Sequence, residues 1–196
     1  MNNAQTFRAR GSYPFAGVGA LLSLFALWSG FSVGGVKNLI TAIFWVAAAL
    51  TFLYLSFIKP KIQIGDEGMV VTNPVLKAQI GWVDVQDLGA KWNMHIRTRD
   101  QNIQVWAAPA PSRRHSRKLH ASEVRGMKSA DFELIPPALS PRSESGIALH
   151  LAEIAWGEFQ KRRDQRVLAY EINKDWRGVI LLGALVAIAF GMTIIN

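Results

Sequence analysis

Three long stretches without a charged side chain restrict what this chain can fold into more than any other feature of its sequence. They run from Tyr13 to about Gly35, from Asn38 to Ile58 and from Gly178 to Asn196. Each is close to the roughly 20 residues that a helix needs to cross about 30 Å of hydrocarbon. A helix buried in a soluble protein rarely has apolar residues on every face over such a length. The sequence therefore predicts three transmembrane helices, the first two forming an antiparallel hairpin.

The charged residues gather between the apolar ends of the chain. All fourteen Asp and Glu, and nineteen of the 22 Lys and Arg, lie between Lys59 and Arg177. Arg8 and Arg10 precede the first apolar stretch, and Lys37 is the only charge in the turn that follows it. Because Lys and Arg near the ends of membrane spans mark the cytoplasmic side, we expect a multi-pass protein of the inner (plasma) membrane. Its N-terminus and middle region would be cytoplasmic, with the hairpin turn and the C-terminus outside.

A signal peptide that ends near Ser32–Gly34 is the alternative interpretation of the first stretch, and it leaves the middle region on the same side. We divide the chain into a transmembrane hairpin at 1–58, a cytoplasmic domain at 59–169, and a connector with the third transmembrane helix at 170–196. The connector is expected to continue as a helix into that last span.

The middle domain has the pattern of an antiparallel sheet closed by a helix. Short alternating segments such as KIQIG, GMVVT and IQVWAA are separated by turn signals, among them Asn73–Pro74. They predict a meander that folds into a small barrel or sandwich. Residues 109–145, rich in Pro, Ser and Arg, predict a long basic loop. A helix that starts near Ser145, capped by Ser143 or Ser145, would bury Ile147, Leu151, Ile154, Ala155 and Phe159.

The segment GDEGMVVTNPVLKAQIGWVDVQDL, residues 65–88, resembles bacterial PH-like domains of the mycobacterial low molecular weight protein antigen type. The resemblance rests on the acidic-Gly turn at Asp66–Gly68, the Asn73–Pro74 turn and the Trp82–Val85 spacing. It implies an α+β domain with a bent antiparallel sheet and a C-terminal capping helix, often preceded by an apolar hairpin. It implies no enzyme activity, and PH-like folds bind lipid head groups, peptides or proteins. Fold alone does not choose among these ligands.

A basic run in the long loop is the candidate contact surface. Arg113, Arg114, Arg117 and Lys118 fall within six residues. The predicted spans would hold this run near a cytoplasmic leaflet that is commonly anionic, where each cation gains about 1 kcal/mol. We therefore expect contact with membrane lipid or an acidic protein partner. A solvated loop is the plain alternative, whereas a nucleic-acid partner would be supported by charge alone and is not expected.

Small residues recur every fourth position in the last apolar stretch, at Gly183, Ala187 and Gly191. Such a stripe lets helices pack closely, which predicts a membrane-protein partner or a homo-oligomer. None of the apolar stretches contains Asp, Glu, Lys, Arg or His, so we expect helices that anchor and assemble rather than transport. The predicted role is a membrane-anchored binding or scaffolding module. The alternative is an accessory subunit of a larger membrane complex, such as a respiratory assembly.

We expect neither catalysis nor a cofactor nor a metal site. The absence of cysteine excludes thiolate chemistry and Cys-ligated metals. His115 and His120, five residues apart in the basic run, have neither a Cys nor an adjacent acidic partner and make a poor metal site, and His95 and His150 are expected to be structural residues of a strand and a helix. Phosphate-loop, nucleophile-elbow and paired-carboxylate signatures are missing. Trp82, Trp92 and Trp106 are expected in the core of the domain, and Trp176 at the membrane surface.

Overall fold

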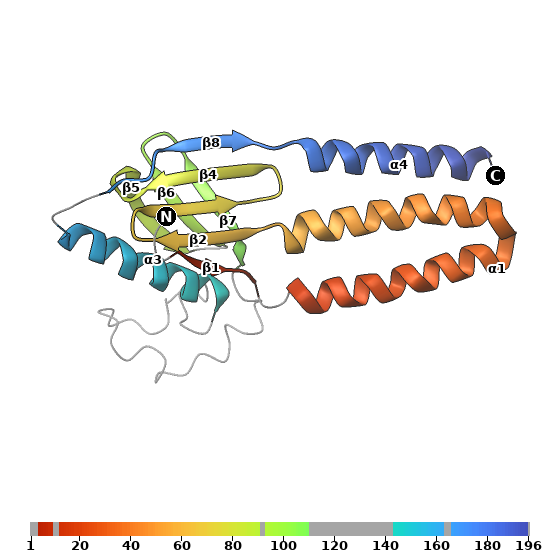
Figure 1. Cartoon of the computed structure of the whole chain (residues 1–196), viewed down its shortest axis with the longest axis horizontal. Coiled ribbons are helices and arrows are strands. Elements are labelled where there is room, and N and C mark those ends of the chain that lie inside the picture. Colours follow the sequence, from red (N-terminus) through yellow and green to blue (C-terminus); the bar gives the residue numbers. More distant parts are fainter. Residues whose placement is uncertain (1–3, 10–11, 91–92, 110–142, 163–165, 196) are drawn as a thin grey trace, which may run out of the picture.

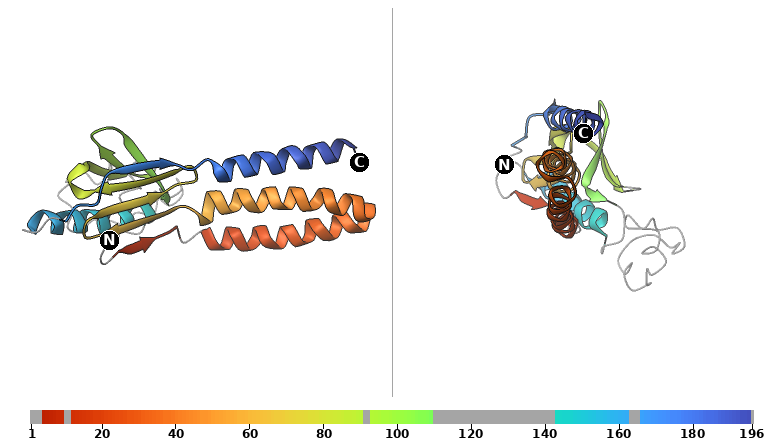
Figure 2. Two further views of the ribbon diagram at one scale, coloured as in Figure 1. Left: turned by 45° about the horizontal axis from the view of Figure 1, so that its top comes forward. Right: turned by 90° about the vertical axis from the view of Figure 1, so that its right-hand side faces the viewer.

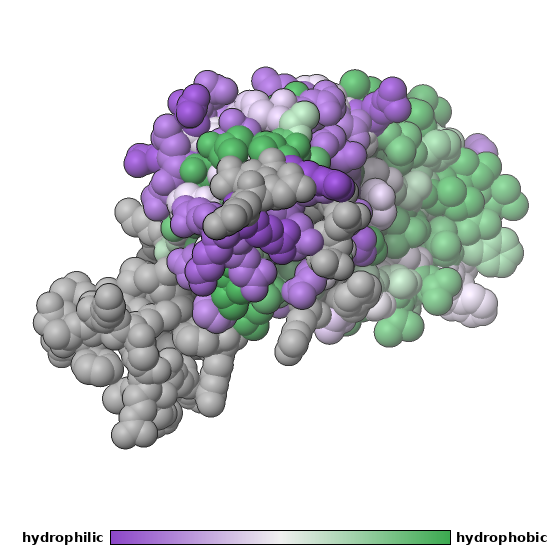
Figure 3. All heavy atoms as spheres, turned by 60° about the vertical axis from the view of Figure 1, so that its left-hand side comes forward, coloured by the Kyte–Doolittle hydropathy of each residue, from purple (hydrophilic) through white to green (hydrophobic). Residues whose placement is uncertain are grey.

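The computed structural model describes residues 4–9, 12–90, 93–109, 143–162 and 166–195. Its apolar helices lie side by side at one end of the long axis, and an α+β domain occupies the other end (Figure 1). The two ends differ in surface character, because the helical end is covered by hydrophobic residues and the domain is mostly hydrophilic (Figure 3). The predicted 109–145 loop lies largely outside the described residues.

Helix α1 (Ser12–Leu53) folds back on itself at two glycines. Gly34 leaves helical geometry, and Gly35 has φ = +61°, a left-handed conformation that costs glycine little. The two arms lie antiparallel, as Figure 2 shows. They approach closely, since a Cβ on Gly30 would stand 2.9 Å from the Cβ of Ala42. The structure thus has two apolar helices rather than three, because the first two predicted spans form one helix divided by a bend.

The end of the hairpin is set by proline. After α1 the chain continues as the π-helical turn η1 (Tyr54–Ile58), and the Lys59 N–H donates to the Tyr54 carbonyl. Pro60 has no N–H to continue this pattern, so the helix stops and strand β2 begins directly at Lys61. No flexible linker separates the hairpin from the domain.

Helix α4 (Arg177–Ile195) packs against the second arm of α1. Ala189 is fully buried in this contact, and the Trp45 Nε1–H donates to the Thr193 hydroxyl at 3.2 Å. Near the domain, Gly178 lies against the Leu55 side chain. Seen end-on, α4 and the two arms of α1 form a row rather than a closed bundle (Figure 2).

Two antiparallel sheets form the domain. The larger one has the order β1-β2-β3-β4-β8, and the smaller one the order β5-β6-β7. Their strands are β1 (Gln5–Phe7), β2 (Lys61–Gly65), β3 (Gly68–Thr72), β4 (Leu76–Gly81), β5 (Val85–Ala90), β6 (Asn93–Thr98), β7 (Asn102–Pro109) and β8 (Glu171–Lys174). The 3₁₀ turn η2 (Trp82–Asp84) carries the chain from the first sheet to the second.

Both edges of the larger sheet come from outside the predicted domain boundary of 59–169. β1 precedes the hairpin and pairs with β2, while β8 leads into α4 and pairs with β4. The connector is therefore not a continuous helix, contrary to the expectation. Pairing with the exposed edge of β4 satisfies its backbone groups, which a helical connector would leave to water.

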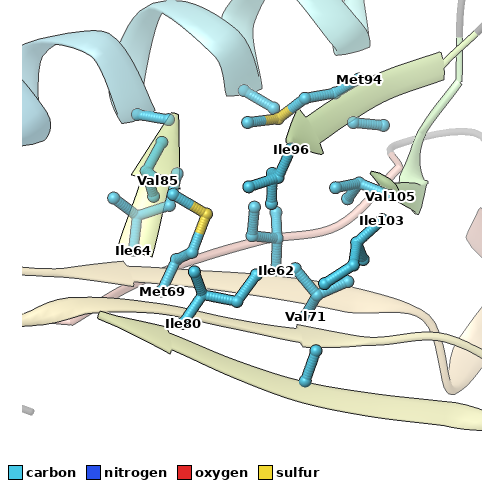
Figure 4. Close-up of a cluster of buried hydrophobic side chains, with 14 of the residues drawn as sticks. Ile62, Ile64, Met69, Val71, Ile80, Val85, Met94, Ile96, Ile103 and Val105 are labelled. Atoms are coloured by element: carbon cyan, nitrogen blue, oxygen red, sulfur yellow. The ribbon is translucent and has the colours of Figure 1, made fainter. Parts of the chain in front are cut away.

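The core lies between the two sheets and helix α3 (Glu144–Lys161) (Figure 4). Alternate residues of the strands point inward, as Ile62, Ile64, Met69 and Val71 do in β2 and β3. Trp82 is 1% exposed, and its indole N–H donates to the Gly65 carbonyl at 3.0 Å. Its predicted core position is confirmed. Trp106, in contrast, is 52% exposed, so that part of the prediction is wrong. Trp92 lies outside the described residues.

Helix α3 begins where the sequence indicated, with the Ser143 hydroxyl accepting from the Gly146 N–H at 2.9 Å. Its buried face is predicted in part. Phe159 is buried, and Leu151 and Ala155 pack partly buried against the core, as expected, whereas Ile154 is 45% exposed. The centre of the buried face is shifted toward Ala148, Leu149 and Ala152.

Candidate functional site

The basic run that the sequence singled out, Arg113, Arg114, Arg117 and Lys118, lies outside the described residues. The small-residue stripe of α4 is described. Gly183 and Ala187 are exposed and Gly191 is half-buried, and a Cβ added to either glycine would meet nothing within 4 Å. Within the chain, α4 therefore packs against the hairpin through Gly178 and Ala189. That the stripe packs against a helix of another chain stays a prediction.

A different set of polar residues gathers at the end of the larger sheet that lies next to the apolar helices. Strands β2 and β4 begin at this end, and β3 and β8 finish here. The sheet register therefore places one cross-strand row at its edge, namely Lys61, Thr72, Lys77 and Asn173. The inward neighbours Ile62, Val71 and Ala78 are buried, so this row lies on the opposite, outer face. Arg8 follows β1 and is one residue beyond the Phe7–Ile62 pair.

The row forms the floor of a cleft of about 450 Å³, which we call the cationic cleft. The end of the hairpin supplies its wall, through Tyr54 and Ile58. The described lining contains four cations and one carboxylate, a net charge of +3. These lining residues are Arg8, Tyr54, Ile58, Lys59, Lys61, Gln63, Thr72, Asn73, Leu76, Lys77, Asn173 and Asp175.

Lys59 connects the hairpin to the sheet at one side of the cleft. Its ammonium donates to the Pro74 carbonyl at 2.8 Å and to Asp175 Oδ2 at 3.0 Å. The Asp175 N–H in turn donates to the Val75 carbonyl at 2.9 Å. One side chain thus joins the end of the hairpin, the β3–β4 turn and the start of α4.

The hydrogen bond from Lys59 lowers the pKa of the Asp175 carboxyl, and the Arg177 backbone N–H, which donates to Oδ1 at 3.3 Å, acts in the same direction. Asp175 is therefore ionised at neutral pH and compensates the charge of Lys59. Among the described residues, no acidic side chain pairs with Arg8, Lys61 or Lys77. These three cations carry the uncompensated charge of the cleft.

Asn73 lines the cleft and connects it to the smaller sheet. Its amide donates from Nδ2 to the Gln104 carbonyl at 2.7 Å, and its Oδ1 accepts from the Trp106 N–H at 3.1 Å. The Asn73 N–H also donates to the Leu76 carbonyl, which closes the β3–β4 turn. The turn predicted at Asn73–Pro74 is confirmed, and the asparagine also ties the larger sheet to β7 of the smaller one.

The remaining predicted polar residues do not assemble into a site. His95, in β6, covers Gly89 on the neighbouring strand, and His150 is exposed on α3. His115 and His120 lie outside the described residues. In the part of the chain that the structure describes, no three His, Asp or Glu side chains are grouped as metal ligands would be. Trp176 is 52% exposed beside the start of α4.

The kind of protein is indicated only broadly, by two helices of membrane length and a cationic cleft beside their ends. Pro14–Ile58 and Arg177–Ile195 are each long and apolar enough to cross a membrane. No family model, curated protein or solved structure matches this chain.

Sequence reasoning missed the cationic cleft for two reasons. In the sequence, Lys59 and Lys61 stand out only as charges that follow an apolar stretch. Arg8 and Asn173 fall beside or within strands that no turn signal marks. The alternation of Lys61 and Gln63 with buried isoleucines was the available signal for an outer polar face. The register that brings Lys77 beside them depends on pairing between distant segments.

Proposed function

We propose that this protein is a membrane-anchored binding or scaffolding module, which presents its domain on the cytoplasmic face of the inner membrane and contacts anionic lipid or a protein partner there. The observation that carries the proposal is the position of the cationic cleft. Three uncompensated cations stand directly beside the ends of two long, exposed, apolar helices.

The exposure of the helices supports a bilayer around them. Only 11% of the most apolar window of the hairpin and 6% of that of α4 are buried within the protein. Core helices of soluble proteins are largely covered, and exposed apolar surface of this extent requires another cover. The 23 residues from 36 to 58 reach roughly 34 Å at about 1.5 Å per residue, which matches the hydrocarbon thickness. We therefore propose three membrane crossings: two by the arms of α1 and one by α4.

The distribution of cations supports the proposed orientation. The cations that flank the helices at the end that carries the domain are Arg8, Lys59, Lys61, Lys174 and Arg177. Lys37, next to the bend, is the only charged side chain at the opposite end among the residues that the structure describes. The positive-inside rule then favours a cytoplasmic domain and an external bend.

The resemblance to bacterial PH-like domains agrees with this proposal. Two antiparallel sheets followed by a covering helix support a PH-like arrangement, while β1 and β8 are additions to it. We propose binding rather than catalysis, with neither a cofactor nor a metal, because the described polar residues form a charged surface instead of an acid–base pair.

Cysteine labelling tests the orientation cleanly, because the chain has no cysteine of its own. Val36→Cys places a thiol at the bend, and Arg99→Cys places one in the β6–β7 turn. A membrane-impermeant maleimide should label only the first variant in intact cells and both after lysis. Labelling of Arg99→Cys in intact cells would contradict the cytoplasmic placement.

Lipid exchange tests the anionic preference of the whole protein. The full chain, purified in mild detergent, is mixed with micelles that contain equal phosphatidylglycerol and phosphatidylcholine. We expect retained lipid to be enriched in phosphatidylglycerol, and the enrichment to fall as salt screens the charges. Equal retention of the two lipids at low salt would remove lipid binding from the proposal.

An accessory subunit of a larger membrane complex is the second candidate, and the open face of α4 favours it. Gly183 and Ala187 are exposed in a row of helices that is not closed into a bundle. Small residues on such a face allow another helix to approach closely. Purification after mild detergent extraction separates the candidates, because a stoichiometric set of large partners would support the subunit.

A further inference from the structure

The geometry points to the cationic cleft as a site for the phosphate group of one anionic glycerophospholipid, held by Arg8, Lys61 and Lys77. This inference rests on the proposed membrane placement and adds to it a defined site and ligand. It assigns the contact to residues of the sheet, whereas the sequence directed attention to the basic run of the long loop.

The spacing of the two lysines suits a phosphate. Lys61 on β2 and Lys77 on β4 both pair with Thr72 on β3, so one strand lies between them. Strands in a sheet are about 4.8 Å apart, which separates the two lysine backbones by roughly 10 Å. Lysine side chains from both sides can then reach one group above the Thr72 hydroxyl. Arg8 lies at the β1 side of Lys61 and offers a planar pair of donors.

Neutral donors complete the floor of the cleft. The Thr72 hydroxyl lies between the two lysines. The Asn173 amide donates to Glu171 Oε1 at 2.7 Å and the Gln63 amide to the Thr6 hydroxyl at 3.4 Å, and each NH₂ group has a second N–H to offer a ligand. A phosphate has several acceptor oxygens, and buried or half-buried oxygens of this kind require donors on more than one side. Lys59 does not add to this set, because its ammonium already donates to Pro74 and Asp175. Lys59 instead acts as a positioning residue that holds the hairpin wall against the sheet.

The wall of the cleft favours a lipid over a soluble phosphate. Tyr54 and Ile58 belong to the last turns of the apolar hairpin, and Tyr54 is 51% exposed. A tyrosine at this depth occupies the interface between head groups and acyl chains. A phosphate in the cleft would therefore have its glycerol beside Tyr54 and its acyl chains along the hairpin. The volume of about 450 Å³ suits a head group, whereas an acidic protein segment would need a more extended groove.

The test compares lipid binding by two variants with the same loss of charge. Lys61→Gln/Lys77→Gln removes two cations of the cleft. Arg97→Gln/Arg99→Gln is the matched control, because Arg97, near the end of β6, and Arg99, in the β6–β7 turn, are both exposed. That turn lies near Tyr170, before β8 and away from the helices. Each full-length protein is titrated in neutral detergent with phosphatidylglycerol, and bound lipid is counted by native mass spectrometry.

We expect one tightly retained phosphatidylglycerol on the unaltered protein and on the control variant. The cleft variant should bind it about 30-fold more weakly, as the loss of two surface cations implies. None of the three proteins should bind phosphatidylcholine tightly. Inorganic phosphate or glycerol phosphate should not displace the phosphatidylglycerol at equal concentration. Thermal melting of all three proteins checks that the substitutions leave the fold intact.

The possible failures are distinguishable. If the unaltered protein prefers phosphatidylglycerol but the cleft variant binds it equally well, the site is wrong while the proposed function stands. If the unaltered protein shows no anionic preference, the site and the lipid-binding part of the proposed function are both overturned, and only the protein-partner part stands. Tight binding of inorganic phosphate, or of an acidic peptide without lipid, would overturn the assignment of the cleft to a lipid.

Discussion

Replacing Asn73 with alanine removes the side chain that joins the two sheets beside the cationic cleft. Its amide bonds the Gln104 carbonyl and the Trp106 N–H of β7, while its backbone belongs to the β3–β4 turn. Asn73 itself is buried, with 6% of its surface exposed. The substitution therefore breaks two hydrogen bonds without disturbing the hydrophobic core.

The magnitude follows from these two bonds. Each contributes about 0.5–1.5 kcal/mol, and Gln104 and Trp106 are exposed enough for water to reach the freed groups. We therefore expect the free energy of unfolding to fall by about 2 kcal/mol, without a further large desolvation penalty. For a chain of this size, that corresponds to a decrease in Tm of about 4–8 °C.

The assay is thermal unfolding of the full chain in detergent, followed by tryptophan fluorescence. Asn102→Ala is the matched control, because Asn102 is exposed at the start of β7. A second variant, Asn73→Asp, keeps the acceptor for Trp106 but loses the donor to Gln104, and should also melt below the unaltered protein. If Asn73→Ala melts at the same temperature as Asn102→Ala, the asparagine does not couple the sheets as described.

Two further substitutions test the junction and the helix packing. Because folding lowers the pKa of Asp175, its ionised form stabilises the folded state above the ordinary carboxyl pKa of about 3.9, and this contribution is lost as the pH falls through the lowered value. Asp175→Asn should thus lower Tm at neutral pH, and the difference from the unaltered protein should shrink below about pH 4; a pH-independent difference would contradict this. Gly178→Val should weaken the α1–α4 contact by about 1–3 kcal/mol, because its side chain would collide with Leu55. Gly183→Val, which meets nothing within the chain, should leave Tm unchanged in the monomer.

Local pattern was enough to predict most of the elements. The strands β2 and β3, the Asn73–Pro74 turn and the start of α3 lie where alternation, turn residues and a serine cap indicated. Each of these signals depends on neighbours within a few residues. The two edge strands, β1 and β8, were not predicted. They are short and polar, and they become strands because an edge of the larger sheet is available to pair with them.

The sequence by itself determined the separation of apolar helices from a charged domain, because hydrophobicity and charge are properties of the residues themselves. It also predicted a reversal between the first two apolar stretches at Lys37, which the structure places slightly earlier, at Gly34 and Gly35. Only the tertiary structure decided which cations meet. Arg8, Lys61 and Lys77 are far apart along the chain, and sheet register brings them to one face beside the helix ends. Register depends on pairing between distant strands, which no local pattern in the sequence records.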